Sequence, residues 1–270
     1  MKITLKNILA VSIMGIASLS PLCAQVTVSQ AKVTASQAKE LLAKADANTS
    51  FAGTDYKADY VVVTDKPGSG KSATNATMYR RDSNSMFTIL ITGPEADRGK
   101  GYVQFDNSIW FFDPRDKQFT YTSAKSKFQN SCINNSDLVP FTFSKDYAIK
   151  SYKEVNLGKF PCVLYELSAT SKGVDYPAIK LWVSKEDGLI RKKEDYSLSG
   201  QLLRTTAIPS YQKVSGRSIP GGMLVVDNLR GTKIDGKMQY EKTQISISNV
   251  TFQKQPNTVY SKQFLQDKSN

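Results

Sequence analysis

Apolar and polar residues alternate with two different periods along this chain, and the first of them is helical. Within residues 35–47 the apolar positions recur three or four apart, on one face of a helix: Ala38, Leu41, Leu42 and Ala45. Thr34 precedes this run and Gln37 follows three positions later, which is the pattern of a capping box at a helix N-terminus. The sequence therefore predicts one amphipathic helix over residues 35–47.

From Tyr56 onward the period changes to two, which is typical of β-strands. Turn-forming pairs such as Asp106-Asn107 and Asp113-Pro114 separate the runs. The predicted strands are 56–64, 77–81, 85–92, 101–106, 108–113, 117–123, 148–156, 161–169, 177–184, 189–196, 202–212, 223–228 and 239–253. Residues 124–146 interrupt the series with a polar, irregular stretch. Strands this closely spaced form successive antiparallel hairpins, so a mainly β (α+β) fold is expected.

One strand requires cover on both sides. Ile109, Trp110, Phe111 and Phe112 are consecutive, so both faces of the strand at 108–113 are apolar. A strongly curved sheet with a helix on its concave side would bury both faces, and so would a sandwich of two sheets. Periodicity alone does not separate these two architectures.

The first 24 residues have the pattern of a secretory signal peptide. Lys2 and Lys6 precede an apolar run over residues 8–19, which is too short to span a bilayer, and Ala24 is a good residue to cleave after. Cys23 leaves acylation as an alternative, although Leu22 stands where a lipoprotein signal wants a small residue. We expect removal of residues 1–24, export to the periplasm, and a single soluble domain over residues 25–270.

Composition restricts the chemistry. The chain has no histidine, which excludes Ser-His-Asp and Cys-His nucleophile systems, histidine-bound zinc and an imidazole proton shuttle. Lys and Arg number 36 against 24 Asp and Glu, a net charge of +12. For an exported protein, this charge favours an anionic membrane surface over nucleic acid as a partner. The positive residues stand in short groups interpreted as solvated strand faces and loops: Arg80-Arg81, Lys125 with Lys127, and Arg191-Lys192-Lys193.

The two cysteines of the expected mature chain are Cys132 and Cys162. An oxidising compartment permits a disulfide between them, which would fasten the irregular stretch to the sheet. The alternative is a buried Cys162 filling core space and a free, exposed Cys132. Two cysteines alone do not decide between these possibilities.

Three short motifs suggest enzymes but are incomplete. Gly68-Ser69-Gly70-Lys71-Ser72 lacks the first glycine of a phosphate-binding loop and is interpreted as a hairpin turn. Ser36-Gln37-Ala38-Lys39 begins the pattern of penicillin-recognising enzymes, whose later elements are missing. The carboxylate pairs Glu186-Asp187 and Glu194-Asp195 lie in or beside turns, on strands interpreted as exposed. We therefore expect no catalytic residue, metal site or cofactor.

An ordered set of short motifs resembles the periplasmic lipoprotein-carrier superfamily, and more closely its outer membrane lipoprotein-sorting (LolA-like) branch. The first motifs are Arg98-Gly99-Lys100-Gly101-Tyr102, Ser108-Ile109-Trp110-Phe111-Phe112-Asp113-Pro114, Lys117-Gln118-Phe119 and Asn135-Ser136-Asp137-Leu138. The later ones are Pro161-Cys162-Val163-Leu164-Tyr165-Glu166-Leu167, Lys180-Leu181-Trp182-Val183, Tyr211-Gln212-Lys213-Val214, Tyr240-Glu241-Lys242-Thr243 and Phe264-Leu265. The resemblance extends over residues 41–265.

This resemblance implies an unclosed antiparallel β-barrel in which helices cover a hydrophobic cavity. Its implied function is to carry lipid or lipoprotein acyl chains toward the outer membrane, as a monomer that receives cargo from an inner-membrane exporter and delivers it to an outer-membrane acceptor. The same fold also allows an alternative, a periplasmic sensing or accessory module that binds a membrane regulator or a lipid exporter, because fold does not fix function.

The cavity wall is expected to come from the aromatic and aliphatic strands, with the helix as its cover. The expected wall residues are Phe87, Ile89, Ile91, Trp110, Phe112, Phe119 and Tyr121, and the cover residues are Leu41 and Leu42. The alternative for each of these side chains is an ordinary place in the packed core, because a curved sheet has two faces.

Overall fold

A computed structural model describes residues 32–269. The predicted signal peptide therefore lies outside the described residues. The predicted helix is confirmed as α1 (Ala35–Ala47), with Thr34 and Gln37 forming the capping box. It buries Ala38, Leu42 and Ala45, whereas Leu41 is half-buried. Within residues 32–269, no helix combines the length and apolar character needed to cross a bilayer.

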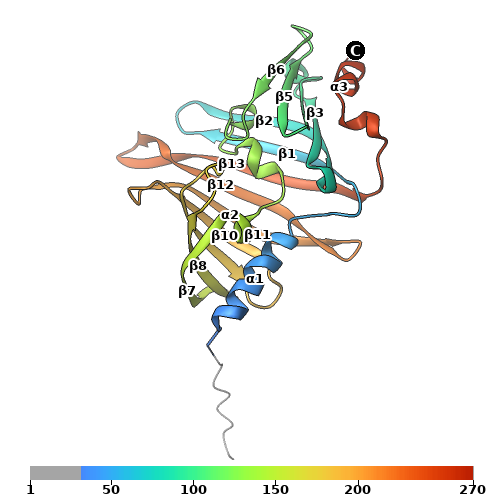
Figure 1. Cartoon of the computed structure of the whole chain (residues 1–270). Coiled ribbons are helices and arrows are strands. Elements are labelled where there is room, and N and C mark those ends of the chain that lie inside the picture. Colours follow the sequence, from blue (N-terminus) through green and yellow to red (C-terminus); the bar gives the residue numbers. More distant parts are fainter. Residues whose placement is uncertain (1–31, 270) are drawn as a thin grey trace, which may run out of the picture. The chain divides into compact units, whose positions relative to one another are not determined.

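The described residues contain thirteen strands, all in one antiparallel sheet (Figure 1). They are β1 (Tyr56–Lys66), β2 (Gly70–Arg81), β3 (Met86–Gly93), β4 (Gly101–Phe105), β5 (Ser108–Asp113), β6 (Gln118–Thr122), β7 (Tyr147–Leu157), β8 (Phe160–Ala169), β9 (Ala178–Ser184), β10 (Ile190–Tyr196), β11 (Leu202–Val214), β12 (Arg217–Ile234) and β13 (Lys237–Phe252). Their order is β6-β5-β4-β3-β2-β1-β13-β12-β11-β10-β9-β8-β7.

Every pair of neighbouring strands in the sheet, except one, consists of strands that follow each other in the sequence. The exception is the pairing of β1 with β13, which joins the two runs of hairpins. β6 and β7 are the two edges of the sheet and do not pair with each other, so the sheet is curved but not closed. This confirms the expected unclosed antiparallel architecture and excludes the sandwich of two sheets.

The longest strand exceeds its predicted length. The sequence predicts a strand at 223–228, but β12 has 18 residues because it continues through Pro220-Gly221-Gly222. Proline and paired glycines normally interrupt a strand. Here the pairing of β11 with β12 shifts register around Ser210, and this irregularity accommodates the three residues. The phosphate-loop-like string Gly68-Ser72 is the turn between β1 and β2 and the start of β2, as interpreted.

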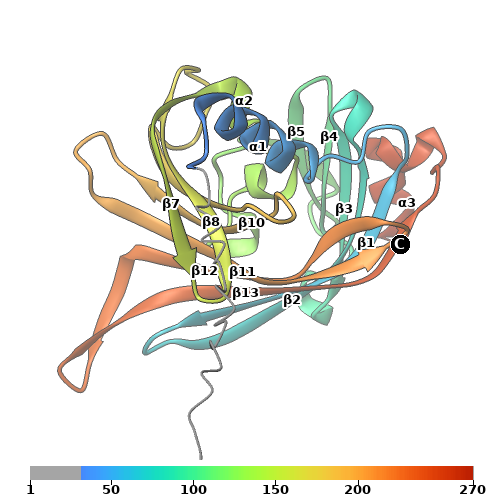
Figure 2. The same cartoon turned by 90° about the horizontal axis from the view of Figure 1, so that it is seen from below.

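The two faces of the sheet are covered by different elements. Figure 2 shows α1 and α2 (Phe143–Asp146) on the concave side and α3 (Lys262–Lys268) on the outer side of the N-terminal strands. The irregular stretch, residues 123–146, crosses the concave side between β6 and β7; we call it the cover segment. It contains α2 and the short 3₁₀ helices η3 (Phe128–Asn130) and η4 (Asn135–Leu138), and the remaining 3₁₀ helices are η1 (Asp82–Asn84), η2 (Glu95–Asp97) and η5 (Asn257–Tyr260).

Candidate functional site: the covered inner face of the sheet

A small apolar cavity lies on the inner face, beneath the C-terminal end of α1. Its volume is about 70 Å³. Apolar side chains make most of its wall, and they come from both halves of the sheet and from the cover segment: Tyr56, Tyr60, Leu138, Val139, Phe141, Ile190, Ile208, Tyr211, Ile219, Met223 and Ile247. A second cavity of about 20 Å³ shares Phe141, Ile190, Ile208 and Met223 with it. This part of the inner face is thus largely apolar and almost completely filled, with Arg80, Asp137 and Lys193 as the charged residues of the cavity walls.

A larger, more open pocket lies on the other side of the cover segment. Its volume is about 310 Å³, and aromatic rings from the cover segment and its surroundings line it together with charged groups. Phe141 borders this pocket as well as both cavities, and its ring stacks on Phe143 with 4.9 Å between centroids. Phe141 therefore separates the inner cavities from the open pocket.

A buried ion-pair network fastens the cover segment to the sheet. Asp137 of η4 accepts two hydrogen bonds from Arg204 of β11, at 2.5 and 2.9 Å. Arg204 Nε also donates to Asp195 at 2.8 Å, and Lys193 Nζ donates to the same carboxylate at 2.8 Å. Burial alone would raise the pKa of Asp137, but Arg204 and then Lys193 outweigh it and hold that pKa below its ordinary value. The charged form of Asp137 therefore strengthens the attachment of the cover.

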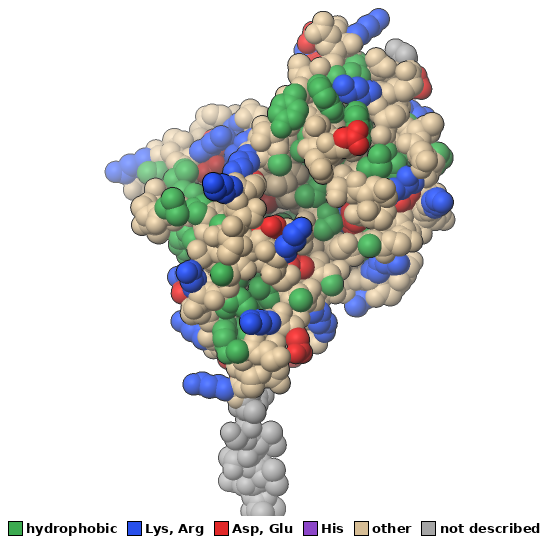
Figure 3. All heavy atoms as spheres, in the orientation of Figure 1, with side chains coloured by type: hydrophobic (Ala, Val, Ile, Leu, Met, Phe, Trp, Pro, Cys, Tyr) green, Lys and Arg blue, Asp and Glu red, His purple; other side chains and the backbone are tan. Residues whose placement is uncertain are grey.

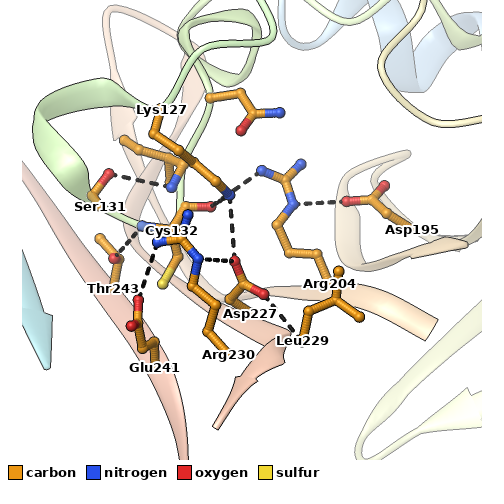
Figure 4. A network of polar contacts seen from close by, with 12 residues as sticks. Lys127, Ser131, Cys132, Asp195, Arg204, Asp227, Leu229, Arg230, Glu241 and Thr243 are labelled. Carbon is orange, nitrogen blue, oxygen red and sulfur yellow. Dashed lines mark hydrogen bonds and ion pairs between the residues drawn. The ribbon is translucent and has the colours of Figure 1, made fainter. Parts of the chain in front are cut away.

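A second set of polar contacts holds the start of the cover segment (Figure 4). The backbone N–H of Cys132 donates to Thr243 Oγ1 of β13 at 2.8 Å, and Lys127 Nζ donates to the Cys132 carbonyl at 3.2 Å. Lys127 also pairs with Asp227 of β12 at 3.5 Å. These contacts satisfy backbone groups that the irregular cover segment would otherwise bury unpaired.

The cover segment is also joined to α1. Asp46, near the end of α1, accepts the backbone N–H groups of Phe143 at 3.0 Å and Ser144 at 2.7 Å. Thr49 Oγ1 accepts from the backbone of Phe141 at 2.9 Å. Burial raises the pKa of Asp46 despite these hydrogen bonds. α1 itself is held on the sheet by Tyr165, which donates to the carbonyl of Ala38 at 2.8 Å.

The structure divides the expected cavity wall between the two faces of the sheet. Ile89 pairs with Tyr102, and Tyr102 with Phe111, so these side chains share the inner face with Phe87 and Ile91. Phe87, Ile89 and Ile91 are fully buried in the core beneath the cover segment, and the cavities described above lie among other residues. Leu42 and Leu41 pack against β8–β10 in a separate core cluster.

The remaining expected wall residues lie on the outer face. Val103 pairs with Trp110, and Trp110 with Tyr121, which places these residues and Phe112 and Phe119 on the side opposite Ile89. Phe112 and Phe119 stack at 4.6 Å and pack beneath α3, whereas Tyr121 is 66% exposed. The wall residues expected from the sequence therefore form two groups on opposite faces of the sheet rather than one continuous wall.

Two other expectations change at this site. Arg80, Arg191 and Lys193, from groups interpreted as solvated, are buried, and so is Asp195 from a carboxylate pair interpreted as exposed. Each of these charges is compensated by an ion pair with a side chain two to four positions away in the sequence. Cys132 and Cys162 are both buried and free, so the possible disulfide is not formed and Cys132 is not exposed.

Sequence reasoning missed the residues that line the inner cavities, among them residues of β10, β11 and β12. Ile190, Ile208 and Met223 are examples. No local signal marks this face, because residues 191–195 are charged at every position, so neither side of the strand stands out as the buried one.

Comparison with known proteins agrees with this architecture. A family described only as uncharacterized proteins matches residues 83–267. No curated protein matches the chain. A LolA superfamily protein from Nitrosomonas europaea has a similar structure, with a TM-score of 0.69, 22% identity, and coverage of 84% of this chain and 98% of that one. A putative outer membrane lipoprotein-sorting protein domain from Vibrio parahaemolyticus gives a TM-score of 0.73 at 16% identity, covering 84% and 97%.

A protein from Desulfovibrio piger, of a family named only as a domain of unknown function, gives the same values as the Vibrio domain: TM-score 0.73, 16% identity, and 84% and 97% coverage. Together these similarities define a LolA-like fold, as the sequence motifs indicated. The chain belongs to the family of uncharacterized proteins that matches residues 83–267.

Proposed function

We propose that the protein is a periplasmic carrier, not an enzyme, and that it holds acyl chains of lipid or lipoprotein on the inner face of its sheet. The observation that carries this proposal is a largely apolar, incompletely filled inner face of an open sheet, closed by a segment that combines buried apolar side chains such as Ile133 with polar attachments to the sheet. The fold shared with a lipoprotein-sorting domain supports it.

The cover must move for cargo to enter. Ligand pockets generally measure about 300–1,000 Å³, whereas the inner cavity measures about 70 Å³. We place the moving part at Val139, Pro140 and Phe141 rather than at α1. α1 buries Ala38, Leu42 and Ala45 against the C-terminal strands, while Val139, Pro140 and Phe141 are half-buried. Elements with the fewest buried contacts open at the lowest free-energy cost.

The energetic balance favours reversible binding. Each buried methylene contributes about 0.8 kcal/mol, so a long acyl chain supplies enough free energy to displace Phe141 and its neighbours from the apolar surface. Polar attachments at the two ends of the moving part, Asp137 and Asp46, stay close to their partners and can guide the cover back when cargo leaves.

A cavity-filling substitution tests the proposal. Met223 lines both inner cavities, and Leu224 beside it points to the opposite face and is 37% exposed. Met223→Trp should weaken binding of a fluorescent fatty acid at least tenfold, whereas Leu224→Trp should leave it unchanged. Far-ultraviolet circular dichroism checks that both variants are folded, because overpacking costs about 1–3 kcal/mol. Absence of fatty-acid binding by the wild-type protein, or equal weakening by both substitutions, would contradict the proposed site.

A further inference from the structure

The ends of two hairpins project side by side from the sheet, away from the inner cavity. They are the β1–β2 end, residues 65–71, and the β12–β13 end, residues 229–242 (Figures 1 and 2). Asp65 pairs with Lys242 across β1 and β13, and a Cβ at Gly68 would lie 3.8 Å from Thr232. The two ends therefore form one surface.

Large apolar side chains are exposed on this surface. Leu229 is 56%, Met238 54% and Tyr240 39% exposed. Met238 and Tyr240 fold together over Gly231, since a Cβ at that glycine would lie 2.8 Å from Met238 Sδ and 3.0 Å from the Tyr240 ring. The register continues this outer face to Leu224, which is also exposed. An exposed apolar group with polar surroundings marks an interaction surface.

Basic side chains surround these apolar groups. The two hairpin ends contain six Lys or Arg (Lys66, Lys71, Arg230, Lys233, Lys237 and Lys242) and three acidic residues (Asp65, Asp235 and Glu241). Among the residues that the structure describes, Lys66, Lys233 and Lys237 have no ion pair, so their charge is uncompensated locally. Figure 3 shows Lys and Arg side chains gathered at the left edge of the molecule, where the hairpin ends lie.

We propose that this hairpin surface docks the protein on an anionic lipid bilayer. Basic residues attract anionic headgroups, and exposed Met, Leu and Tyr side chains enter the boundary between headgroups and acyl chains. The charge complementarity favours a bilayer over a second copy of this chain, because two copies of a positive surface repel each other. The inference is independent of the proposed carrier function, since docking does not require that the inner face hold lipid.

Co-sedimentation with vesicles tests the electrostatic part. Wild-type protein should pellet with vesicles of phosphatidylcholine containing phosphatidylglycerol, and remain in solution with phosphatidylcholine alone. Lys233→Glu/Lys237→Glu should weaken binding tenfold or more, because each basic residue near an anionic surface is worth about fivefold in affinity. The matched control is Lys150→Glu/Lys153→Glu on β7, which changes the same net charge at exposed lysines on an edge of the sheet. Equal loss in both variants would show attraction by net charge alone and overturn the assignment.

A second pair of variants tests the apolar part. Met238→Ser/Tyr240→Ser should weaken binding to the anionic vesicles about fivefold or more, whereas Tyr121→Ser, at a side chain 66% exposed on the edge strand β6, should not. Circular dichroism confirms folding, and fatty-acid binding measured on the same variants separates loss of docking from loss of the carrier site. Unchanged sedimentation of the double variant, no binding by wild type, or dimerisation through this surface in size-exclusion chromatography would each contradict the proposal.

Discussion

The outer face of the N-terminal strands and the inner face of the sheet are both apolar and both covered, but the covers differ in kind. α3 packs closely on the outer face, where Leu265 lies so near the sheet that a Cβ at Gly101 would be 2.5 Å from it. The cover segment leaves cavities beneath it and is held by buried ion pairs and backbone hydrogen bonds. Close apolar packing suits a permanent cover, whereas polar attachments around an incompletely filled space suit one that opens.

Removing the central cation of the inner face should have the largest effect on stability. Arg204→Met leaves Asp137 and Asp195 buried with only Lys193 between them. Breaking a buried ion pair in this way costs about 3–5 kcal/mol, measurable as a fall in the free energy of unfolding by urea. Arg98→Met, at an arginine that pairs with Glu95 where both side chains are mostly exposed, is the control and should cost less than about 1 kcal/mol. Similar costs for the two substitutions would mean that the network does not hold the cover.

Truncation of a buried side chain of α3, the outer cover, should have the second-largest effect on stability. Leu265 is fully buried against Val103 and Phe112, so Leu265→Ala should lower the free energy of unfolding by about 2–4 kcal/mol. Fatty-acid binding should be unchanged, because α3 covers the face opposite the cavities. A variant that lost stability and also bound fatty acid differently would remove the distinction between permanent and opening covers.

Truncation of the inner cover should cost less stability and change binding. Phe141 is half-buried and separates the cavities from the open pocket. Phe141→Ala should cost about 1–2 kcal/mol, less than a fully buried phenylalanine. It should also increase the association rate of fatty acid in stopped-flow fluorescence, because the barrier to entry is smaller. A slower rate would assign Phe141 to the binding surface instead of the cover.

The smallest expected effect is a change in how the stability of the protein depends on pH. The pKa of Asp137 is lower in the folded than in the unfolded protein, so its contribution to stability is complete above the unfolded pKa of about 3.9 and is lost as the pH falls through the folded pKa. Asp137→Asn should therefore flatten the decline in stability below about pH 4, measured by thermal unfolding at a series of pH values. A decline as steep as that of the wild type would show that other carboxylates control it.

The sequence predicted helices and strands better than it predicted which face of the sheet each side chain occupies. The helix at 35–47 and the hairpins followed from spacing and turn residues, and the apolar run at 108–113 correctly indicated cover on both sides. Periodicity could not say which parity of β5 faces inward, because both parities are apolar. As a result Trp110 and Phe112 were grouped with Phe87, although they lie on opposite faces of the sheet.

The charged part of the site escaped prediction for another reason. From the sequence alone, Lys193 and Asp195 have the pattern of solvated residues. In the folded protein they form a buried network with Arg204 and Asp137. Asp137 comes from an irregular segment 67 positions away from Arg204. Contacts over such separations depend on how strands and covers meet in space, and no local spacing encodes them.

The seam between β1 and β13 has a consequence for the order of folding. Each half of the sheet consists of hairpins between consecutive strands, which can form from nearby segments. The seam instead joins distant segments, as in the contact between Thr64 and Thr243, 179 positions apart. Closing so long a loop costs the most entropy. The inner cavity takes its wall from both sides of this seam, with Tyr60 on β1 and Ile247 on β13, so it is a late product of folding that neither half can form alone.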